Sequence, residues 1–331
     1  MIGLAITVLL LAWTLHGVDL AAVIGHIREA NPWWFALGIT CATLTFPLRA
    51  IRWRVMLRAN DGGAFPFAPL WRAVAVGFMA NNLLPARMGE VVRAYLVTRE
   101  LPVRFSTAIA SIAAERVFDG LTLVLFLWVA MLGSAGAGHS LQSNATLIQI
   151  AHWAGVVFVI AFAIGLAMAW QPTRTQSVVA RVAQRIFPPR LAHRVTDVVA
   201  GLVRGLGVLR DPRRAAGVVG WSLVLWFING LSFAACFRAF DLELPWTAAF
   251  PLQALVGFGV AVPSSPGFFG PLEAFMRLTL GLYGIPADRA VSYAVAYHIG
   301  GFLPITLIGL YELSRSRLRL GALRRVAADP K

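Results

Sequence analysis

The sequence of 331 residues has little charge and almost no lysine. Charged residues make up 13% of the chain, and 28 of its 29 basic side chains are arginines, with Lys331 as the exception. Hydrophobic residues make up 58%, and the mean hydropathy is +0.72. Such a composition excludes an ordinary soluble fold. It predicts an all-α polytopic membrane protein.

Cysteine and catalytic motifs are also scarce. Cys41 and Cys236 both lie inside apolar runs, which excludes a disulfide framework and a cysteine-based metal site. The sequence contains no nucleophile elbow, no Walker loop and no HExxH motif, so no motif predicts catalysis. We therefore expect a protein that is not an enzyme and that uses no cofactor and no metal.

The net charge of +14 is compatible with binding either nucleic acid or a membrane surface. Arginines are densest in residues 171–214, which hold nine arginines and two aspartates. Apolar residues recur there at helical spacing opposite the basic ones, which is typical of an amphipathic helix on anionic lipid. Membrane lipids, anionic or phosphate-bearing, are therefore the expected partners, and nucleic acid is not.

Six apolar stretches have roughly the length of a membrane span. They cover residues 1–17, 31–57, 104–133, 147–170, 216–237 and 290–313. The loop 134–147 carries no charged side chain, whereas the segments after the second, fourth and last spans are rich in arginine. The positive-inside rule then places this loop outside and both termini in the cytoplasm of a cell (inner) membrane.

Two further apolar stretches are interrupted by helix-breaking residues. The first, residues 70–99, breaks and then continues through a set of polar and charged positions: Asn81, Asn82, Pro85, Arg87, Gly89, Glu90 and Arg93. The second, residues 246–283, does the same through Pro263, Ser264, Ser265, Pro266, Gly267, Gly270 and Glu273. We expect each of these stretches to form a helical hairpin. A re-entrant hairpin and a hairpin of two full spans both return the chain to the same side of the membrane, so the sequence leaves both arrangements open.

Each break places the N-terminus of a new helix inside the membrane, and we expect Ser264 and Ser265 to cap the second of these helices. Free N–H groups and a partial positive charge at such ends attract anions. With Arg87 and Arg93 beside one end, the pattern favours a phosphate site. The alternative is that Glu90 and Glu273 merely neutralise the first helical turns.

Glu115, Arg116 and Asp119 open the span 104–133. They are expected to pair with the buried arginines or to relay protons, or else to form a charge cluster at headgroup level. His298 lies on a helix of small and aromatic residues, and we expect it to be structural.

The chain is expected to be one transmembrane domain over residues 1–331 with an internal repeat. Residues 31–133 and 216–313 share the same order: an apolar helix ending in arginine, an interrupted element and a further span. The fourth span and the basic segment 171–214 join the two repeats. An odd number of spans separates equivalent helices, so the repeats should be inverted in the membrane, as in many transporters.

Three motifs in this order, NNLLPARMGEVVRAYL, AERVFDGL and PSSPGFFGPLEAF, resemble the flippase-like membrane domain family, also called the lysylphosphatidylglycerol synthase transmembrane region. The resemblance implies lipid handling, since bifunctional members translocate an aminoacylated phospholipid and relatives are linked to polyprenyl-phosphate sugars or hopanoids. It implies a stand-alone member without the cytosolic synthase domain. It also implies that the following positions are inherited from the family: Asn81, Asn82, Pro85, Arg87, Gly89, Glu90, Arg93, Glu115, Arg116, Asp119, Pro263, Pro266, Gly267, Gly270 and Glu273.

Two functions are therefore expected from the sequence. The first is a flippase or transporter that holds a phosphate-bearing lipid headgroup between the two breaks. The second is a non-transporting membrane subunit that presents lipid to a separate glycosyl- or aminoacyl-transferase.

Overall fold

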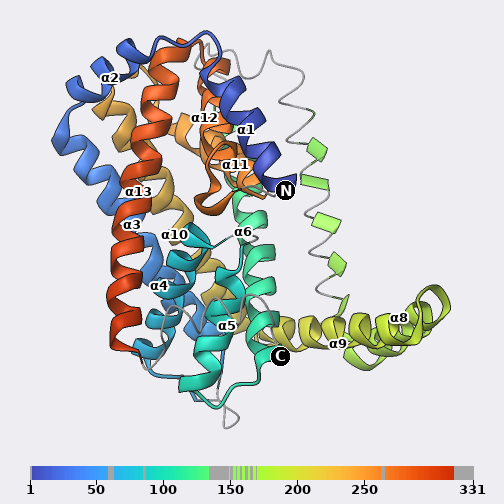
Figure 1. Ribbon diagram of the computed structural model, residues 1–331. Coiled ribbons are helices and arrows are strands. Elements are labelled where there is room, and N and C mark those ends of the chain that lie inside the picture. The colour runs from blue at the N-terminus through green and yellow to red at the C-terminus, as the bar shows by residue number, and fades with distance from the viewer. Residues whose placement is uncertain are drawn as a thin grey trace.

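The computed structural model describes residues 2–58, 63–84, 87–133, 170–261 and 265–316, and shorter pieces at 149, 152–153, 155–156, 159–160, 163–164 and 167–168. Within these residues every regular element is a helix (Figure 1). Some predictions fall outside the described residues: Pro85, Pro263, Ser264, the loop 134–147 and most of the fourth expected span.

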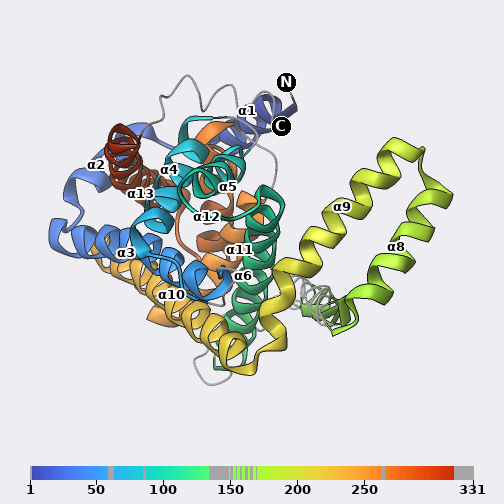
Figure 2. The ribbon, with the colours of Figure 1, turned by 90° about the horizontal axis from the view of Figure 1, so that it is seen from below.

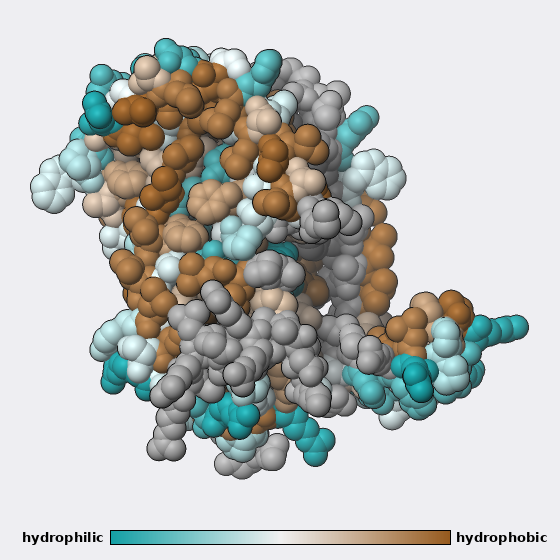
Figure 3. Space-filling model, viewed as in Figure 1, coloured by the Kyte–Doolittle hydropathy of each residue, from teal (hydrophilic) through white to brown (hydrophobic). Residues whose placement is uncertain are grey.

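The frame of the molecule consists of four long helices, which confirms the prediction of an all-α membrane protein. They are α3 (Pro32–Met56), α6 (Phe105–Gly133), α10 (Pro212–Ala239) and α13 (Ala287–Arg315). In the described part of the chain, α3, α10 and α13 are long and apolar enough to cross a membrane. Apolar residues cover much of the middle of the face seen in Figure 3, with polar residues toward both ends.

Helices α3 and α10 lie side by side in opposite directions. At one end the Asn31 amide donates to the Ala239 carbonyl at 2.8 Å. At the other end the Arg214 guanidinium donates to the carbonyls of Val55 and Met56 at 3.2 and 3.1 Å. These contacts satisfy carbonyls that a helix end leaves without an intrahelical partner.

The N-terminal segment forms two helices, α1 (Ile2–Leu15) and α2 (Leu20–Glu29), with a bend of 82° between them. The 14 residues of α1 extend about 21 Å, which is less than the roughly 30 Å of a bilayer core. The expected first span is therefore a short helix followed by a sharp turn. Arg277 fixes the end of α1 by donating to the carbonyls of Trp13, Thr14 and His16 at 2.5, 2.7 and 3.1 Å.

The first interrupted element is a hairpin of α4 (Phe67–Leu83) and α5 (Gly89–Glu100), which pack on each other. The helices approach closely because Gly77 faces Gly89: a Cβ on Gly89 would lie 1.9 Å from the Gly77 carbonyl oxygen. The Asn81 side chain accepts a hydrogen bond from the Gly89 amide at 2.8 Å. This bond closes the break predicted from the sequence.

The second interrupted element has the same form. Helices α11 (Ala249–Val260) and α12 (Pro271–Leu282) pack on each other, and short 3-10 turns, η3 (Trp246–Ala248) and η4 (Pro266–Phe268), precede them. The Glu273 carboxylate accepts the Gly270 amide at 2.8 Å and so closes the first turn of α12. Ser265 lies outside that turn, and its amide donates to the Thr7 hydroxyl of α1 at 2.9 Å. The prediction that Ser265 caps this helix was wrong, because Gly270 is the N-cap residue of α12 and Glu273 accepts its amide hydrogen.

The two hairpins occupy opposite halves of the molecule, and their tips meet near its middle (Figure 1). The Arg87 guanidinium of the first tip lies 5.5 Å from the ring centroid of Phe268 in the second. Both residues have positive φ angles, 55° and 65°. Side chains with a Cβ rarely adopt this conformation, and such strain is concentrated at functional sites.

The basic segment 171–214 forms an arm of two helices, α8 (Pro172–Ile186) and α9 (Pro189–Gly205), where the sequence predicted one amphipathic helix. Pro188 and Pro189 separate them because proline disfavours a helical residue before it and cannot continue a backbone ladder. The short turn η2 (Leu206–Arg210) follows, and α9 packs against α6. The arm projects sideways (Figure 2) and is apolar along its upper edge and polar below (Figure 3).

The close approach of the first hairpin gives a stability prediction. In Gly89→Ala the new methyl group would overlap the Gly77 carbonyl and the Asn81 side chain, so we expect a loss of about 1–3 kcal/mol and a lower melting temperature in detergent. Gly281→Ala is the matched control, because nothing lies within 4 Å of a Cβ on this helical glycine. Equal melting of the two variants would contradict the hairpin packing.

Candidate functional site

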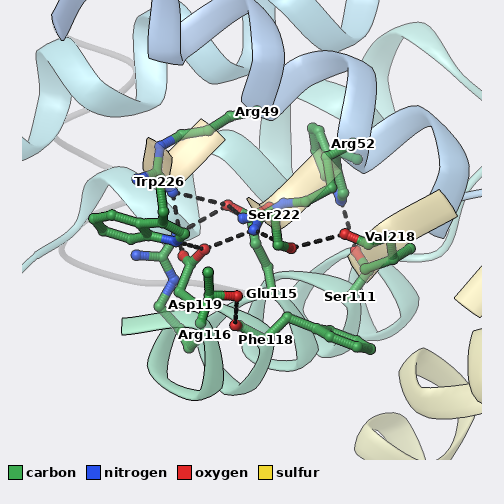
Figure 4. A network of polar contacts seen from close by, with 12 residues as sticks. Arg49, Arg52, Ser111, Glu115, Arg116, Phe118, Asp119, Val218, Ser222 and Trp226 are labelled. Atoms are coloured by element: carbon green, nitrogen blue, oxygen red, sulfur yellow. Dashed lines mark hydrogen bonds and ion pairs between the residues drawn. The ribbon is translucent and has the colours of Figure 1, made fainter. Parts of the chain in front are cut away.

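A buried network of charged side chains joins four helices, α3, α5, α6 and α10, in the half of the molecule that holds the first hairpin (Figure 4). Glu115 and Asp119 stand one turn apart on α6, so they share one face of that helix. Arg49 and Arg52 share a face of α3 in the same way and point toward them. Arg93 of α5 and Arg116 of α6 complete the set of four arginines.

Glu115 is fully buried and contacts all four arginines. It receives a bidentate pair of hydrogen bonds from Arg93 at 2.9 and 3.2 Å. Arg52 lies 3.1 Å away, and Arg116 donates at 2.9 Å. Bidentate contacts between guanidinium and carboxylate are among the strongest hydrogen bonds in proteins.

Asp119 binds α3 and α10 to α6. It accepts from Arg52 at 2.6 Å, from Arg49 at 3.2 Å and from the Trp226 indole at 2.9 Å. Arg52 also donates to the Ser222 hydroxyl of α10 at 2.9 Å. The hairpin helix α5 and the long helices α3, α6 and α10 therefore meet at two carboxylates.

Aromatic rings cover the arginines that the carboxylates bind. The Arg93 guanidinium lies 3.9 Å from the ring centroid of Trp53, and Arg49 lies between Phe78 and Trp226 at 5.4 and 5.2 Å. Such cation–π contacts stabilise a cation more strongly when water is excluded.

The network holds more positive than negative charge. Four arginines surround two carboxylates, and Arg49, Arg52 and Arg93 are buried. Arg116 differs, because its side chain is 37% exposed while it contacts Glu115 and Asp119. The surplus positive charge therefore reaches the accessible surface through Arg116.

Arg87 and Glu90 lie next to the network at the first tip. Arg87 is within electrostatic reach of both Glu90 and Arg116, and its side chain is half-buried. Among the described residues the Arg87 guanidinium has neither a hydrogen-bond acceptor nor an ion pair, although its Nε atom is buried. Arg87 and Arg116 can thus offer donors to an anion that enters between the tips.

The second tip is arranged around Glu273, on α12, and His298, on α13. Nδ1 of His298 lies 2.5 Å from Oε1 of Glu273, and Nε2 lies 2.7 Å from the Gly267 carbonyl oxygen. Both side chains are buried. No hydrogen bond or ion pair joins Glu90 to Glu273 in the described part of the chain, so each carboxylate belongs to its own tip.

The structure sorts the residues predicted from the sequence into three groups. Arg93, Glu115, Arg116 and Asp119 come together in the network, with Arg87 and Glu90 beside it. Asn81, Asn82 and Gly89 hold the first hairpin in place, since Asn82 donates to the Thr306 hydroxyl of α13 at 2.8 Å. Ser265, Pro266, Gly267, Gly270 and Glu273 form the second tip.

Sequence reasoning missed Arg49 and Arg52 as members of this network, and it predicted a structural role for His298. The two arginines looked like the basic end of a span, yet their spacing of three residues on an otherwise apolar helix was a usable signal for one buried polar face. The described residues contain no group of three or more histidine, cysteine, aspartate or glutamate side chains that could hold a metal ion.

Comparison with known proteins finds one matching family and several relatives. Residues 1–309 match the family model described as the lysylphosphatidylglycerol synthase TM region. A glycosyltransferase named AglD of Haloferax volcanii is 27% identical, with 89% of this chain and 51% of the relative covered. A UPF0104 membrane protein of Methanothermobacter thermautotrophicus is 24% identical (87% and 85% covered), and one of Pyrococcus horikoshii is 22% identical (96% and 96% covered).

The chain thus spans about half the length of the glycosyltransferase and nearly the whole length of the Pyrococcus protein. The family model covers the interrupted hairpins, the charged network, three of the long helices and most of α13. This membrane protein therefore belongs to the lysylphosphatidylglycerol synthase TM region family.

Proposed function

We propose that this protein is a lipid flippase or transporter, without enzymatic activity, that holds the phosphate group of a lipid between its two hairpin tips. The observation that carries the proposal is the surplus of positive charge in the buried network, which reaches the accessible surface at Arg116. Arg87, which has no acceptor among the described residues, supplies a second cation. Arginine suits phosphate because its planar fork can donate two parallel hydrogen bonds.

The lengths of the hairpin helices support a re-entrant arrangement. Helices α5, α11 and α12 have 12 residues each and α4 has 17. They extend about 18 Å and about 25 Å, whereas a full crossing needs roughly 30 Å. Two hairpins of this length entering from opposite faces would meet near the midplane. A headgroup could then exchange between the faces while its acyl chains stay in the lipid.

The packing also supports an inverted repeat. Helices α3 and α10, which begin the two repeats, are antiparallel neighbours. Each hairpin then contacts the last helix of the other repeat, α4 with α13 and α11 with α6. Such exchange around an axis in the membrane plane is the arrangement of inverted-repeat transporters, whose sites lie where the repeats meet.

A second function is favoured by one of the relatives. The Haloferax protein is named a glycosyltransferase and is about twice as long as the region it shares with this chain. This chain could accordingly present a lipid-linked sugar to a separate transferase without moving it across the bilayer. Lipid binding without transfer in purified vesicles would favour this second function.

The proposed site predicts the effect of two substitutions on lipid transfer. Arg87→Gln and Arg116→Gln should each slow the transfer of fluorescent phosphatidylglycerol in reconstituted vesicles by roughly tenfold to a hundredfold, because a hydrogen bond to a charged group contributes about 1.5–3 kcal/mol. Arg99→Gln is the matched control, because Arg99 is exposed and contacts only Tyr95 of its own helix in the described chain. Unchanged transfer in both site variants would contradict the proposal.

Arg52→Gln separates the structural arginines from the site arginines. Arg52 is fully buried and binds both carboxylates, and breaking a buried ion pair costs about 3–5 kcal/mol. We expect much less folded protein after size-exclusion chromatography in detergent, whereas Arg116→Gln should fold. A well-folded Arg52→Gln protein would show that the network is not needed for assembly.

The arginine distribution predicts the orientation in the membrane. In a protein with Cys41 and Cys236 replaced by alanine, Ser140→Cys should react with an impermeant maleimide on intact cells. Ser177→Cys, in the exposed part of α8, should react only after permeabilisation. The reverse pattern would place both termini outside.

A further inference from the structure

His298 is held at both nitrogens of its ring. Nε2 lies 2.7 Å from the Gly267 carbonyl oxygen, and a carbonyl only accepts hydrogen bonds, so Nε2 carries a proton. Nδ1 lies 2.5 Å from Oε1 of Glu273. Oε2 of the same carboxyl group accepts the Gly270 amide. The ring is therefore enclosed between two oxygen atoms.

This geometry requires a second proton between His298 and Glu273. The proton sits either on Nδ1, giving imidazolium and carboxylate, or on Oε1, giving neutral imidazole and carboxylic acid. Without it, the lone pair of Nδ1 would face a carboxylate oxygen at hydrogen-bond distance, and the contact would be repulsive. The heavy-atom arrangement therefore fits the proton-loaded form of the pair.

Apolar packing surrounds the pair and leaves it few other partners. The ring centroid of Phe269 lies 4.4 Å from that of the imidazole, and the ring centroid of Phe302 lies 6.4 Å from it. Helices α1 and α11, which pack on α12, carry no titratable side chain. Tyr293 and Tyr297 of α13 face α10, where they bind the Phe233 carbonyl and the Ser232 hydroxyl.

The other charged groups near α12 and α13 are bound elsewhere or lie at helix ends. Some of these groups form ion pairs with other carboxylates: Arg72 of α4 binds Glu100 and Glu312, and Arg49 and Arg52 of α3 bind Asp119. Others bind backbone groups: Arg277 binds the end of α1, Arg54 the Phe65 carbonyl, Arg214 of α10 the end of α3, Asp288 the Asp19 amide before α2, and Arg289 the Asp241 carbonyl. The remaining groups lie at helix ends: His26, Arg28, Glu29, Arg213, Arg238 and Arg315.

We propose that Glu273 and His298 form a proton-binding site whose occupancy sets the position of the second hairpin tip. Gly267, which the imidazole holds, directly precedes Phe268, and the Phe268 ring contacts Arg87 of the first tip. Release of the proton to solvent leaves one ring proton between two acceptor oxygens, so the imidazole can no longer hold both Glu273 of α12 and Gly267 of the tip, and the tip shifts relative to α12 and α13. The contact with Arg87 then changes as well.

The consequence for transport rests on the proposed lipid transfer. A proton that moves the second tip changes the space beside Arg87 and Arg116, so a proton gradient drives the headgroup from one face to the other. The chemical species at this site is a proton, and neither Glu273 nor His298 belongs to the pair of arginines, Arg87 and Arg116, that is proposed to bind the phosphate. The proton site and lipid transfer can therefore be tested separately.

The first experiment tests the proton site without any transport. Protein labelled with ¹⁵N-histidine is placed in phosphatidylglycerol nanodiscs, and the His298 signals are assigned through His298→Gln. In the wild type we expect one of the two ring nitrogens to change from a hydrogen-bonded to an unprotonated signal in one step as the pH rises. In Glu273→Gln the amide can still accept from Gly270 and donate to Nδ1, so this step should vanish. Identical titration of His298 in both proteins would overturn the proposal.

The second experiment tests coupling in vesicles that contain fluorescent phosphatidylglycerol. A one-unit pH gradient should speed wild-type transfer by up to about tenfold, the ratio of proton activities for one proton per lipid. Glu273→Gln and His298→Gln should lose this response, and His16→Gln, at the exposed end of α1, should keep it. A response that persists in both pair variants, or is missing in the wild type, would overturn the coupling.

These outcomes distinguish the two proposals. If wild-type protein moves no phosphatidylglycerol, lipid transfer fails for this lipid, and the nanodisc titration still decides whether the proton site exists. If His298→Gln does not fold, Glu273→Gln carries the comparison, because the substituted amide preserves the hydrogen bond to Gly270.

Discussion

The pairing of Glu115 and Asp119 with four arginines is the constraint on which the assembly of this protein depends. Lipid gives helices no hydrophobic reason to associate, and a buried charge without a partner is very costly. Helices α3, α5 and α6 can keep their charged side chains buried only by meeting at the two carboxylates, and α10 joins them through Ser222 and Trp226. The position of the first hairpin is therefore set by ion pairs as much as by the close fit of Gly77 and Gly89.

The two hairpin tips have the same construction and different electrostatics. The first tip borders a network with surplus positive charge, whereas the second holds Glu273 against a single histidine. One cation–π contact, between Arg87 and Phe268, joins them in the described residues. In the proposed function, this division of labour lets an anion bind at one tip and a proton at the other. Two residues in the left-handed region of the backbone map lie where the tips touch, which is where a moving contact would be expected to store strain.

Much of the fold could be predicted because its signals are local. Asn81 and Pro85 mark the first break by their backbone chemistry alone, and apolar runs mark the long helices. Partners far apart in sequence could not be predicted: Arg49 and Arg52 reach carboxylates about seventy positions away, and periodicity carries no information on such pairs. The contact of His298 with Glu273 could not be predicted for the same reason, because only the packing of α12 on α13 brings the two side chains together.

The surplus charge of the network argues against a purely structural role. If the ion pairs served only to hold helices together, equal numbers of arginine and carboxylate would do so at lower desolvation cost. The chain instead places four arginines around two carboxylates and leaves Arg116 accessible. An anion arriving beside Arg116 and Arg87 would offset part of that unfavourable charge, and in the proposed function this anion is a lipid phosphate. The same surplus explains why a zwitterionic lipid would gain less than an anionic one, since its ammonium group would meet the cations that its phosphate seeks.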